Sequence, residues 1–238
     1  MSSPASLKDQ LCDRLTEVIG RINVAAVRAK RSVSEITLIA ISKTHSADRI
    51  RIAIDCGAID IGENRLQEAE PKILEIGRDR VHWHLVGHLQ ANKARKAVRL
   101  FDVIHSVDSI DLAKRLDRLC IEEQREVLPI LVQINLGGEK TKSGIDKRDI
   151  YALVEAIEQC QRLRLMGLMS VPPYFEDPND VRPFFSRLRE LRDQLKERGA
   201  FADRIGELSM GMTHDFEVAI EEGATMVRIG TAIFGERW

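Results

Sequence analysis

The segment ITLIAISK at residues 36–43 is an apolar run of strand length that ends in a lysine, and MVRIG at residues 226–230 is a second such strand. An ammonium group is costly to bury without a partner, so a lysine at the end of a buried strand needs a reason. One reason is chemical, because a partly desolvated lysine can lose its proton and attack an aldehyde. The alternative is that Lys43 is simply a solvated residue at a strand end.

Segments rich in Ile, Leu and Val alternate with amphipathic segments of helical period along most of the chain. The predicted strands are 36–43, 58–63, 81–87, 101–107, 128–135, 163–171, 205–209 and 226–230. The predicted helices between them lie near 46–56, 65–76, 91–99, 109–124, 147–160, 180–198 and 214–222. This alternation indicates a parallel sheet, and eight such units in 238 residues fit a (β/α)8 TIM barrel. A doubly wound sheet would usually have fewer strands and a G-x-G-x-x-G turn after the first, which is missing here.

Ahead of the first strand, five apolar residues recur at helical spacing and predict a long helix over residues 6–31. They are Leu7, Leu11, Leu15, Ile19 and Ile22. No Pro/Gly-rich linker or low-complexity tract interrupts the rest of the chain. We therefore expect residues 1–238 to form one α/β domain.

In a barrel of this kind, phosphate groups commonly bind to the loops after the seventh and eighth strands. Those loops here are SMGMTHD at 209–215 and GTA at 230–232, which could present backbone N–H groups to an anion. Their glycines could instead serve only turns, and their hydroxyls only helix caps. Arg228 shares a strand face with Gly230, which predicts that it points into the barrel. A structural arginine paired with a carboxylate is the other interpretation.

Composition and charge narrow the class of protein. The net charge is -1, which predicts no general attraction to nucleic acid or to a membrane. The four cysteines are far apart and form no C-x-x-C motif, so we expect neither a disulfide framework nor a thiolate zinc site. The first residues contain no signal-peptide h-region, and we expect a cytoplasmic protein.

Three histidines, His82, His84 and His88, suggest a metal site on the third strand. A barrel hydrolase would need further ligands at other strand ends, and no matching set of His, Lys and Asp is present in the sequence. We therefore expect no metal. His84 and His88 are predicted to line or support the pocket, with His82 near the strand start.

Five segments together resemble the pyridoxal phosphate homeostasis proteins of the YggS/PROSC type. They are IAISKTH at 39–45, IGENRLQE at 61–68, HWHLVGHLQANK at 82–93, SMGMTHDFEVAI at 209–220 and VRIGTAIFG at 227–235. The resemblance covers nearly the whole chain. One departure is Thr213, where family members more often have serine, and either hydroxyl can cap the following helix.

The resemblance implies a barrel similar to the N-terminal domain of alanine racemase, the fold type III of pyridoxal 5'-phosphate (PLP) proteins. It implies PLP bound as a Schiff base on Lys43, with Arg228 facing the pyridine nitrogen and Asn64 lining the pocket. Ser209, Gly230 and Thr231 would hold the phosphate. Met210 and Ser170 are further candidates.

The resemblance also implies a carrier that buffers or delivers PLP and so influences vitamin B6 and amino-acid metabolism. Catalysis is not expected, because an arginine leaves the pyridine nitrogen unprotonated and the ring a poorer electron sink. Racemases of this fold add a tyrosine from a second domain, and the tyrosines of this chain, Tyr151 and Tyr174, are not expected to replace it. A weak racemase-like enzyme and a Schiff-base aldolase acting on a phosphosugar are the alternatives.

Expected partners are PLP and apo-forms of PLP-dependent enzymes, without nucleic acid or membrane, and we expect a monomer. The loop at residues 137–144 contains Gly and Lys but not the order of a P-loop. We interpret it as a mobile surface loop at the barrel mouth. Within it, Lys142 is a candidate to hold a second PLP molecule transiently.

Overall fold

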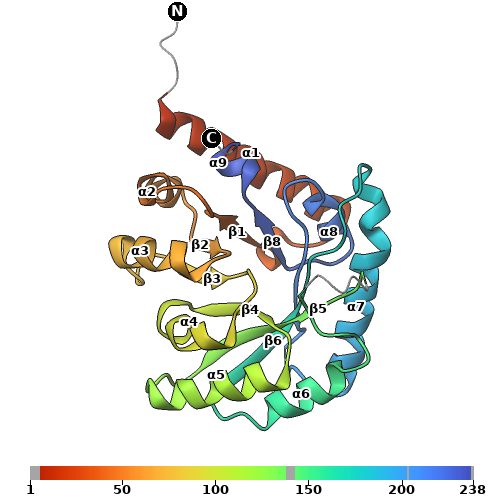
Figure 1. Cartoon of the computed structure of the whole chain (residues 1–238). Helices are drawn as coiled ribbons and strands as arrows, with labels where there is room; N and C mark the ends of the chain where they lie inside the picture. The colour runs from red at the N-terminus through yellow and green to blue at the C-terminus, as the bar shows by residue number, and fades with distance from the viewer. Residues whose placement is uncertain (1–5, 138–142, 203, 237–238) are drawn as a thin grey trace, which may run out of the picture.

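A computed structural model of the chain describes residues 6–137, 143–202 and 204–236. Within these residues, parallel strands close into a barrel in sequence order, and the last strand pairs with the first (Figure 1). The strands are β1 (Thr37–Ile41), β2 (Asp60–Glu63), β3 (His82–Leu85), β4 (Val103–Val107), β5 (Leu128–Ile134), β6 (Leu163–Ser170), β7 (Glu207–Ser209) and β8 (Met226–Ile229). The predicted (β/α)8 barrel is confirmed, with every predicted strand in place.

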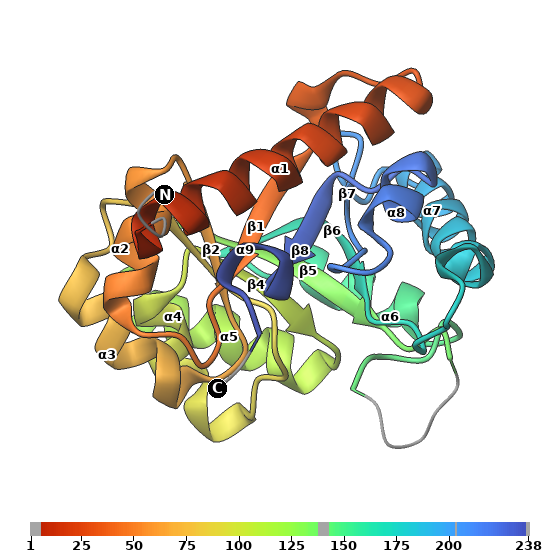
Figure 2. The ribbon, with the colours of Figure 1, turned by 90° about the horizontal axis from the view of Figure 1, so that it is seen from above.

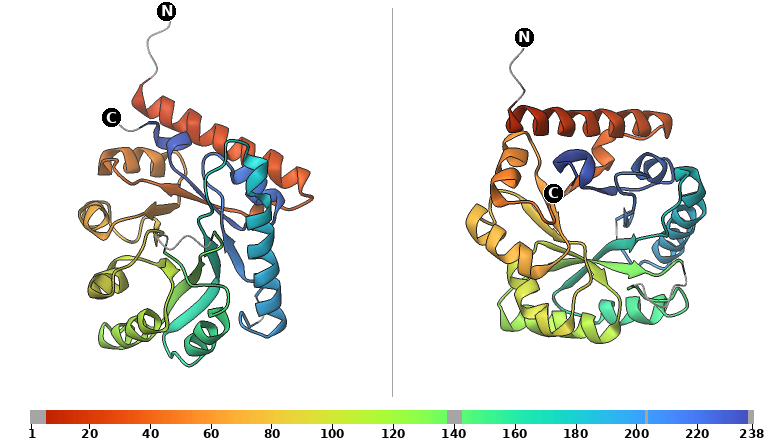
Figure 3. Two further views of the ribbon diagram at one scale, coloured as in Figure 1. Left: turned by 45° about the vertical axis from the view of Figure 1, so that its right-hand side comes forward. Right: turned by 45° about the horizontal axis from the view of Figure 1, so that its top comes forward.

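Helices surround the barrel, as the two views of Figure 3 show. They are α1 (Leu7–Arg28), α2 (Ala47–Asp55), α3 (Leu66–Ile76), α4 (Ala94–Leu100), α5 (Ile110–Glu122), α6 (Ile150–Glu158), α7 (Arg182–Glu197), α8 (Phe216–Glu221) and α9 (Thr231–Phe234). Short 3-10 turns are η1 (Val33–Glu35), η2 (Ala91–Lys93) and η3 (Pro178–Val181). The predicted helices are confirmed with small shifts at their ends, whereas α9 was not predicted. None of the described helices is long and apolar enough to cross a membrane.

The long N-terminal helix lies along the outside of the barrel beside α8 and α9 (Figure 2). It begins with a capping box, in which Ser6 and Asp9 each accept the other's backbone N–H. It ends at Arg28 rather than at residue 31, because Lys30 has a φ of 55° and leaves the helical conformation. Its apolar face is buried through Leu11, Leu15 and Ile22, as the periodicity predicted. Leu7 and Ile19, which the same periodicity placed on this face, are instead 45% and 41% exposed.

One disulfide corrects the expectation from the cysteine spacing. Cys12 of α1 and Cys56 at the end of α2 are disulfide-bonded, with their Cα atoms 5.2 Å apart. They are separated by 44 residues in sequence, but α1 packs on α2 and brings them together. Cys120 and Cys160 are free thiols, and burial raises the pKa of each to about 11.

The barrel interior contains an apolar cluster that is separate from the larger core between strands and helices. The buried members of this cluster are Ile39, Ile41, Leu131, Met169 and Met226. Because strand residues alternate between faces, Lys43 follows Ile39 and Ile41 on the inner face of β1. A Cβ atom at Gly62 would lie 2.4 Å from Ile41 Cδ1, so the glycine makes room for this packing.

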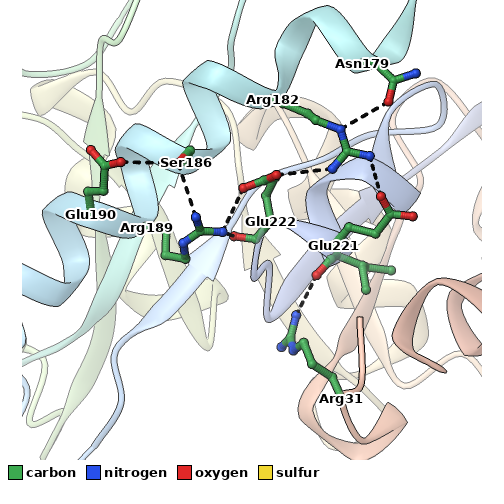
Figure 4. A network of polar contacts seen from close by, with 9 residues as sticks. Arg31, Asn179, Arg182, Ser186, Arg189, Glu190, Glu221 and Glu222 are labelled. Carbon is green, nitrogen blue, oxygen red and sulfur yellow. Dashed lines mark hydrogen bonds and ion pairs between the residues drawn. The ribbon is translucent and has the colours of Figure 1, made fainter. Parts of the chain in front are cut away.

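Arginines fix α8, the helix that follows the predicted phosphate loop (Figure 4). Arg182 of α7 contacts both Glu221 and Glu222, and Arg189 contacts Glu222 at 2.8 Å. From the segment after α1, Arg31 donates to the carbonyl of Ile220 at 3.0 Å. The C-terminal end of α8 is therefore bonded both to α7 and to the segment after α1. These contacts fix the helix and so position the loop that leads into it from β7.

Candidate functional site

A cavity of about 360 Å³ opens at the carboxyl ends of the barrel strands. Residues from the loops after β1, β2, β3, β6, β7 and β8 line it. The lining residues are Ile41, Lys43, His45, Asn64, Val86, Val171, Met212, Thr213, His214, Arg228, Gly230, Thr231 and Gly235. Five of the six predicted site residues are among them, and the sixth, Ser209, is not.

A larger hollow of about 450 Å³ lies beside α5 and contains none of those predicted residues. It is lined by His88, among others, so His88 does not line the cavity that holds Lys43. We take the smaller cavity as the candidate site because Lys43, Arg228 and Gly230 all line it. Ligand sites are typically concave and contain a few polar groups that converge in this way.

The backbone on both sides of Lys43 is fixed by acidic residues of neighbouring elements. Ser42 points to the outer face, where its hydroxyl donates to Glu63 at 2.6 Å. On the other side, the N–H of Thr44, whose φ is 68°, donates to Glu68 at 3.1 Å. The half-buried Lys43 is therefore held at a defined point of the barrel mouth.

A buried ion pair supports Ser42 from outside the barrel. Lys72 of α3 donates to Glu63 Oε1 at 2.6 Å and to the carbonyl of Ser42 at 2.9 Å. The side chain of Glu63 is fully buried, and burial raises its pKa even though Lys72 and Ser42 oppose the shift. The two hydrogen bonds of Lys72 therefore join α3 to Ser42 and Glu63, the residues that precede Lys43 and Asn64 in the sequence.

Backbone at the start of α9 forms one wall of the cavity. Gly230 and Thr231 precede and begin this helix, and the first N–H groups of a helix have no acceptor within it. A Cβ atom at Gly230 would lie 3.2 Å from the carbonyl oxygen of Ile41, so a side chain there would crowd β1. The arrangement suits an anionic group close to the main chain.

The loop after β7 supplies a neighbouring part of the cavity wall. Gly211 has a φ of 89°, and a Cβ there would lie 2.5 Å from that of Ala219 in α8. The N–H of Met212 donates to Asp215 at 2.6 Å, which ties the loop to the start of α8. Burial raises the pKa of Asp215, although this hydrogen bond opposes the shift.

Arg228 lies inside the barrel at the base of the cavity. It is 4% exposed, and its guanidinium donates to Ser209 Oγ at 2.7 Å and to the Ser170 carbonyl at 2.8 Å. Among the described residues no carboxylate lies within 4.0 Å of it, so the structure does not show the alternative of a paired structural arginine. Burial lowers the pKa of Arg228 to about 10, which leaves it charged at neutral pH.

Ser209 and the two further candidates lie behind Arg228. The Ser209 hydroxyl is buried and bonds Arg228 and His105, rather than facing the cavity. Ser170 contributes its carbonyl oxygen to Arg228, and Met210 is buried with its N–H on the carbonyl of Met226. These three residues therefore surround Arg228, and Ser209 is not among the residues that line the cavity.

Sequence reasoning assigned no role to several lining residues, of which His45 and His214 are the most polar. The ring of His45 stacks on Phe234 of α9, with centroids 5.0 Å apart. The ring of His214 lies 5.1 Å from that of Tyr174, which is 75% exposed. Both histidines lie in the motifs that carry the family resemblance. His45 follows Lys43 by two residues and His214 directly follows Thr213, and this position was the signal that could have predicted them as lining residues.

The other histidines of the third strand have structural contacts. His82 and His84 both contact Asp60 Oδ1, at 3.1 and 3.0 Å. In the described part of the chain no group of three or more His, Cys, Asp or Glu side chains is placed to hold a metal ion. Of the loop at residues 137–144, positions 138–142 lie outside the described residues, and with them Lys142.

Comparison with known families first places the chain in a class. The family model of the alanine racemase N-terminal domain matches residues 21–237, which is nearly the whole chain. This agrees with the closed barrel of parallel strands.

Curated relatives then identify the family within that class. The pyridoxal phosphate homeostasis protein of Aquifex aeolicus is 42% identical over 226 residues, covering 95% of this chain and 98% of the relative. That of Escherichia coli K12 is 40% identical, covering 96% and 97%. The solved structure of PipY from Synechococcus elongatus PCC7942, with PLP bound, has a TM-score of 0.80 and 38% identity, covering 95% and 100%. The chain belongs to the pyridoxal phosphate homeostasis protein family.

Proposed function

We propose that this protein binds PLP in the cavity as a Schiff base on Lys43 and acts as a carrier that buffers or delivers it. The observation that carries the proposal is the convergence of Lys43, Arg228 and the N-terminal backbone of α9 on one cavity. These are the three kinds of group that an aldehyde, a pyridine nitrogen and a phosphate require. The PLP-bound structure of the relative PipY supports the same assignment.

Each lining residue has a role in this proposal. Lys43 supplies the amine, and the backbone of Gly230 and Thr231 binds the phosphate. Arg228 faces the pyridine nitrogen as a donor, and Asn64 orients the ring from the β2 side. Ser209 acts through Arg228 and not on the phosphate, given the position of its hydroxyl.

The nature of Arg228 favours a carrier over a catalyst. PLP is a strong electron sink only when its pyridine nitrogen is protonated, and an acidic residue normally maintains that proton. A guanidinium only donates hydrogen bonds and is not a proton acceptor at neutral pH. The carrier role requires a lysine, a phosphate cradle and an open mouth, without a second acid/base.

A weak racemase-like activity is the second candidate, because Tyr174 packs on His214 at the cavity wall. The other tyrosine, Tyr151, bonds Gln194 between α6 and α7 and is remote from the cavity. If Tyr174 were the second base, Tyr174→Phe would abolish any exchange of the substrate α-proton with solvent deuterium. We expect no robust exchange in either protein.

We also propose that the carrier is a cytoplasmic monomer whose recipients are apo-forms of PLP-dependent enzymes. In a reducing compartment the Cys12–Cys56 disulfide would be subject to opening, because such bonds are rare in the cytosol. Light scattering on the purified protein tests the monomer. Activation of an apo-enzyme across a dialysis membrane, compared with direct mixing, tests whether transfer needs contact.

The deciding experiment is the visible spectrum of the purified protein with added PLP, before and after borohydride reduction. We expect an imine band that Lys43→Ala lacks, and a reduced PLP adduct on the peptide that contains Lys43. Lys93→Ala is the matched control, because Lys93 lines a neighbouring hollow and not this cavity. An unchanged band in Lys43→Ala would refute the lysine assignment. A protein that never shows the band would point to the phosphosugar alternative.

A further inference from the structure

A line of hydrogen bonds crosses the barrel interior beneath the cavity, from β2 to β8. Asp60 Oδ1 contacts His84 Nε2 at 3.0 Å, and His84 Nδ1 contacts His105 Nε2 at 2.9 Å. His105 Nδ1 contacts Ser209 Oγ at 3.0 Å, and Ser209 Oγ contacts Arg228 at 2.7 Å. All five side chains are buried. We call this line the Asp60–Arg228 relay.

The two ends of the relay fix the direction of every bond in it. Arginine only donates and an ionised carboxylate only accepts, so Arg228 donates to Ser209 and His84 donates to Asp60. A neutral His84 with its proton on Nε2 must then accept at Nδ1, which requires a proton on His105 Nε2. His105 therefore accepts at Nδ1, where the Ser209 hydroxyl donates. Each N–H or O–H hydrogen of the relay is donated once, and the direction of each hydrogen bond is set by the bond next to it.

The competing arrangement places two protons on His84. His105 would then donate from Nδ1 to Ser209, whose hydroxyl hydrogen would be left without an acceptor among these partners. That arrangement also sets two buried cations against one carboxylate, which a low-dielectric interior penalises. The first arrangement contains one cation, Arg228, and one anion, Asp60.

The pKa shifts of His105 and Asp60 fit a neutral imidazole and an ionised carboxylate, which both arrangements share. Burial lowers the pKa of His105 well below its usual value, and the charge of Arg228 adds to this shift, so His105 is neutral at neutral pH. Burial opposes ionisation of Asp60, but hydrogen bonds from His84 and His82 lower its pKa on balance. His82 approaches Asp60 from the solvent side, with its side chain 69% exposed.

We infer that Asp60, His84 and His105 are positioning residues for Arg228, joined to it through Ser209 in a relay of one fixed polarity. The relay commits the Ser209 hydroxyl to His105, so Ser209 accepts from Arg228 and has no proton for a ligand. Arg228 is thereby held at the cavity base as a pure donor. The effect of this donor on PLP binding rests on the proposed function, whereas the direction of the hydrogen bonds in the relay does not.

The polarity is tested in protein without any added cofactor. In a long-range proton–nitrogen correlation spectrum of ¹⁵N-histidine protein at neutral pH, we expect both His84 and His105 to be neutral. Each should have a protonated Nε2 and an unprotonated Nδ1. Assignments come from His84→Gln and His105→Gln. A proton on Nδ1 of either ring, or two protons on His84, would overturn the inference.

The effect on the cavity is tested with His105→Phe and with His84→Gln, in case the first variant fails to fold. His105→Phe removes the relay partner of Ser209, and His84→Gln removes the ring that sets the tautomer of His105. In each variant we expect PLP to bind about tenfold more weakly, as for one buried hydrogen bond. We also expect a shifted absorption band of the bound PLP, which a merely structural loss would not produce.

His82→Gln is the control, because His82 touches Asp60 outside the relay. Wild-type affinity and spectrum in folded His105→Phe or His84→Gln would refute the positioning role. If the wild-type protein itself does not bind PLP, the proposed function fails, while the nitrogen spectrum still decides the polarity of the relay.

Discussion

Replacing Lys72 with methionine should show how much the barrel wall behind Lys43 depends on one ion pair. The side chain of Lys72 is 11% exposed and that of Glu63 is fully buried, with 2.6 Å between their charged atoms. Methionine keeps most of the apolar stem but removes the ammonium group. Glu63 then keeps only the Ser42 hydroxyl as a donor, and its Oε2 already has no partner.

The expected magnitude follows from this burial. Removing one partner of a buried pair costs about 3–5 kcal/mol, mainly because an uncompensated charge remains inside the protein. We take about 3 kcal/mol, since Lys72 retains some contact with solvent. For a chain of this length, that loss lowers Tm by about 6–12 °C.

The cost should also depend on pH. The folded-state pKa of Glu63 is raised, so this residue makes the fold most stable below its unfolded pKa, and that contribution is lost as pH rises through the folded pKa. Without Lys72 the folded pKa rises further. The variant should therefore lose little stability in acid, where Glu63 is protonated, and the full amount above the raised pKa.

Urea unfolding followed by circular dichroism, at neutral and at mildly acidic pH, measures both effects. The matched control is the double variant Glu63→Gln with Lys72→Met, which contains neither charge and should recover most of the loss. A loss below about 1 kcal/mol at neutral pH would show that the pair is solvated and contributes as surface pairs do. An equal loss at both pH values would refute the account based on an ionised Glu63.

Two further changes have clear expectations. Gly211→Ala forces a side chain into a φ of 89° and within 2.5 Å of Ala219, so we expect a loss of about 2–4 kcal/mol and weaker PLP binding, measured by urea unfolding and by titration. The matched control is Gly20→Ala on α1, where nothing lies within 4 Å of the new Cβ, and a similar loss there would contradict the explanation. Reduction of the Cys12–Cys56 disulfide, which closes a separation of 44 residues, should cost about 3–4 kcal/mol in the chain-entropy model. A dithiol reductant should therefore lower Tm in the wild type but not in Cys12→Ser, and an equal Tm with and without reductant would show that the bond is not formed in solution.

The barrel could be predicted from sequence because short segments rich in Ile, Leu and Val alternate with segments of helical period. The helix α9 was missed because four residues are too few to show any period, although it forms part of the cavity wall. The disulfide was missed for a different reason. Separation along the chain says nothing about the packing of α1 on α2, which alone brings Cys12 and Cys56 together.

Site residues at strand ends, and Arg228 within β8, could be predicted from the sequence, whereas His105 beneath them could not. Lys43 and Gly230 follow apolar runs, and the barrel topology places such positions at one mouth. His105 lies inside β4 with no feature in the sequence that separates it from an ordinary core histidine. Its contact with His84 joins the neighbouring strands β3 and β4, whereas its contact with Ser209 of β7 exists only because the barrel closes.

The strand β2 shows how charged residues become compatible with a fully buried barrel strand. Its four residues alternate between faces, so that Asp60 and Gly62 point inward while Ile61 and Glu63 point outward. Inside, Asp60 forms the β2 end of the relay through its contact with His84, and outside, Glu63 pairs with Lys72. Asn64 then follows on the inner face, at the cavity. The position of the lysine therefore depends on β2 as much as on its own strand, because Glu63 fixes Ser42 next to it.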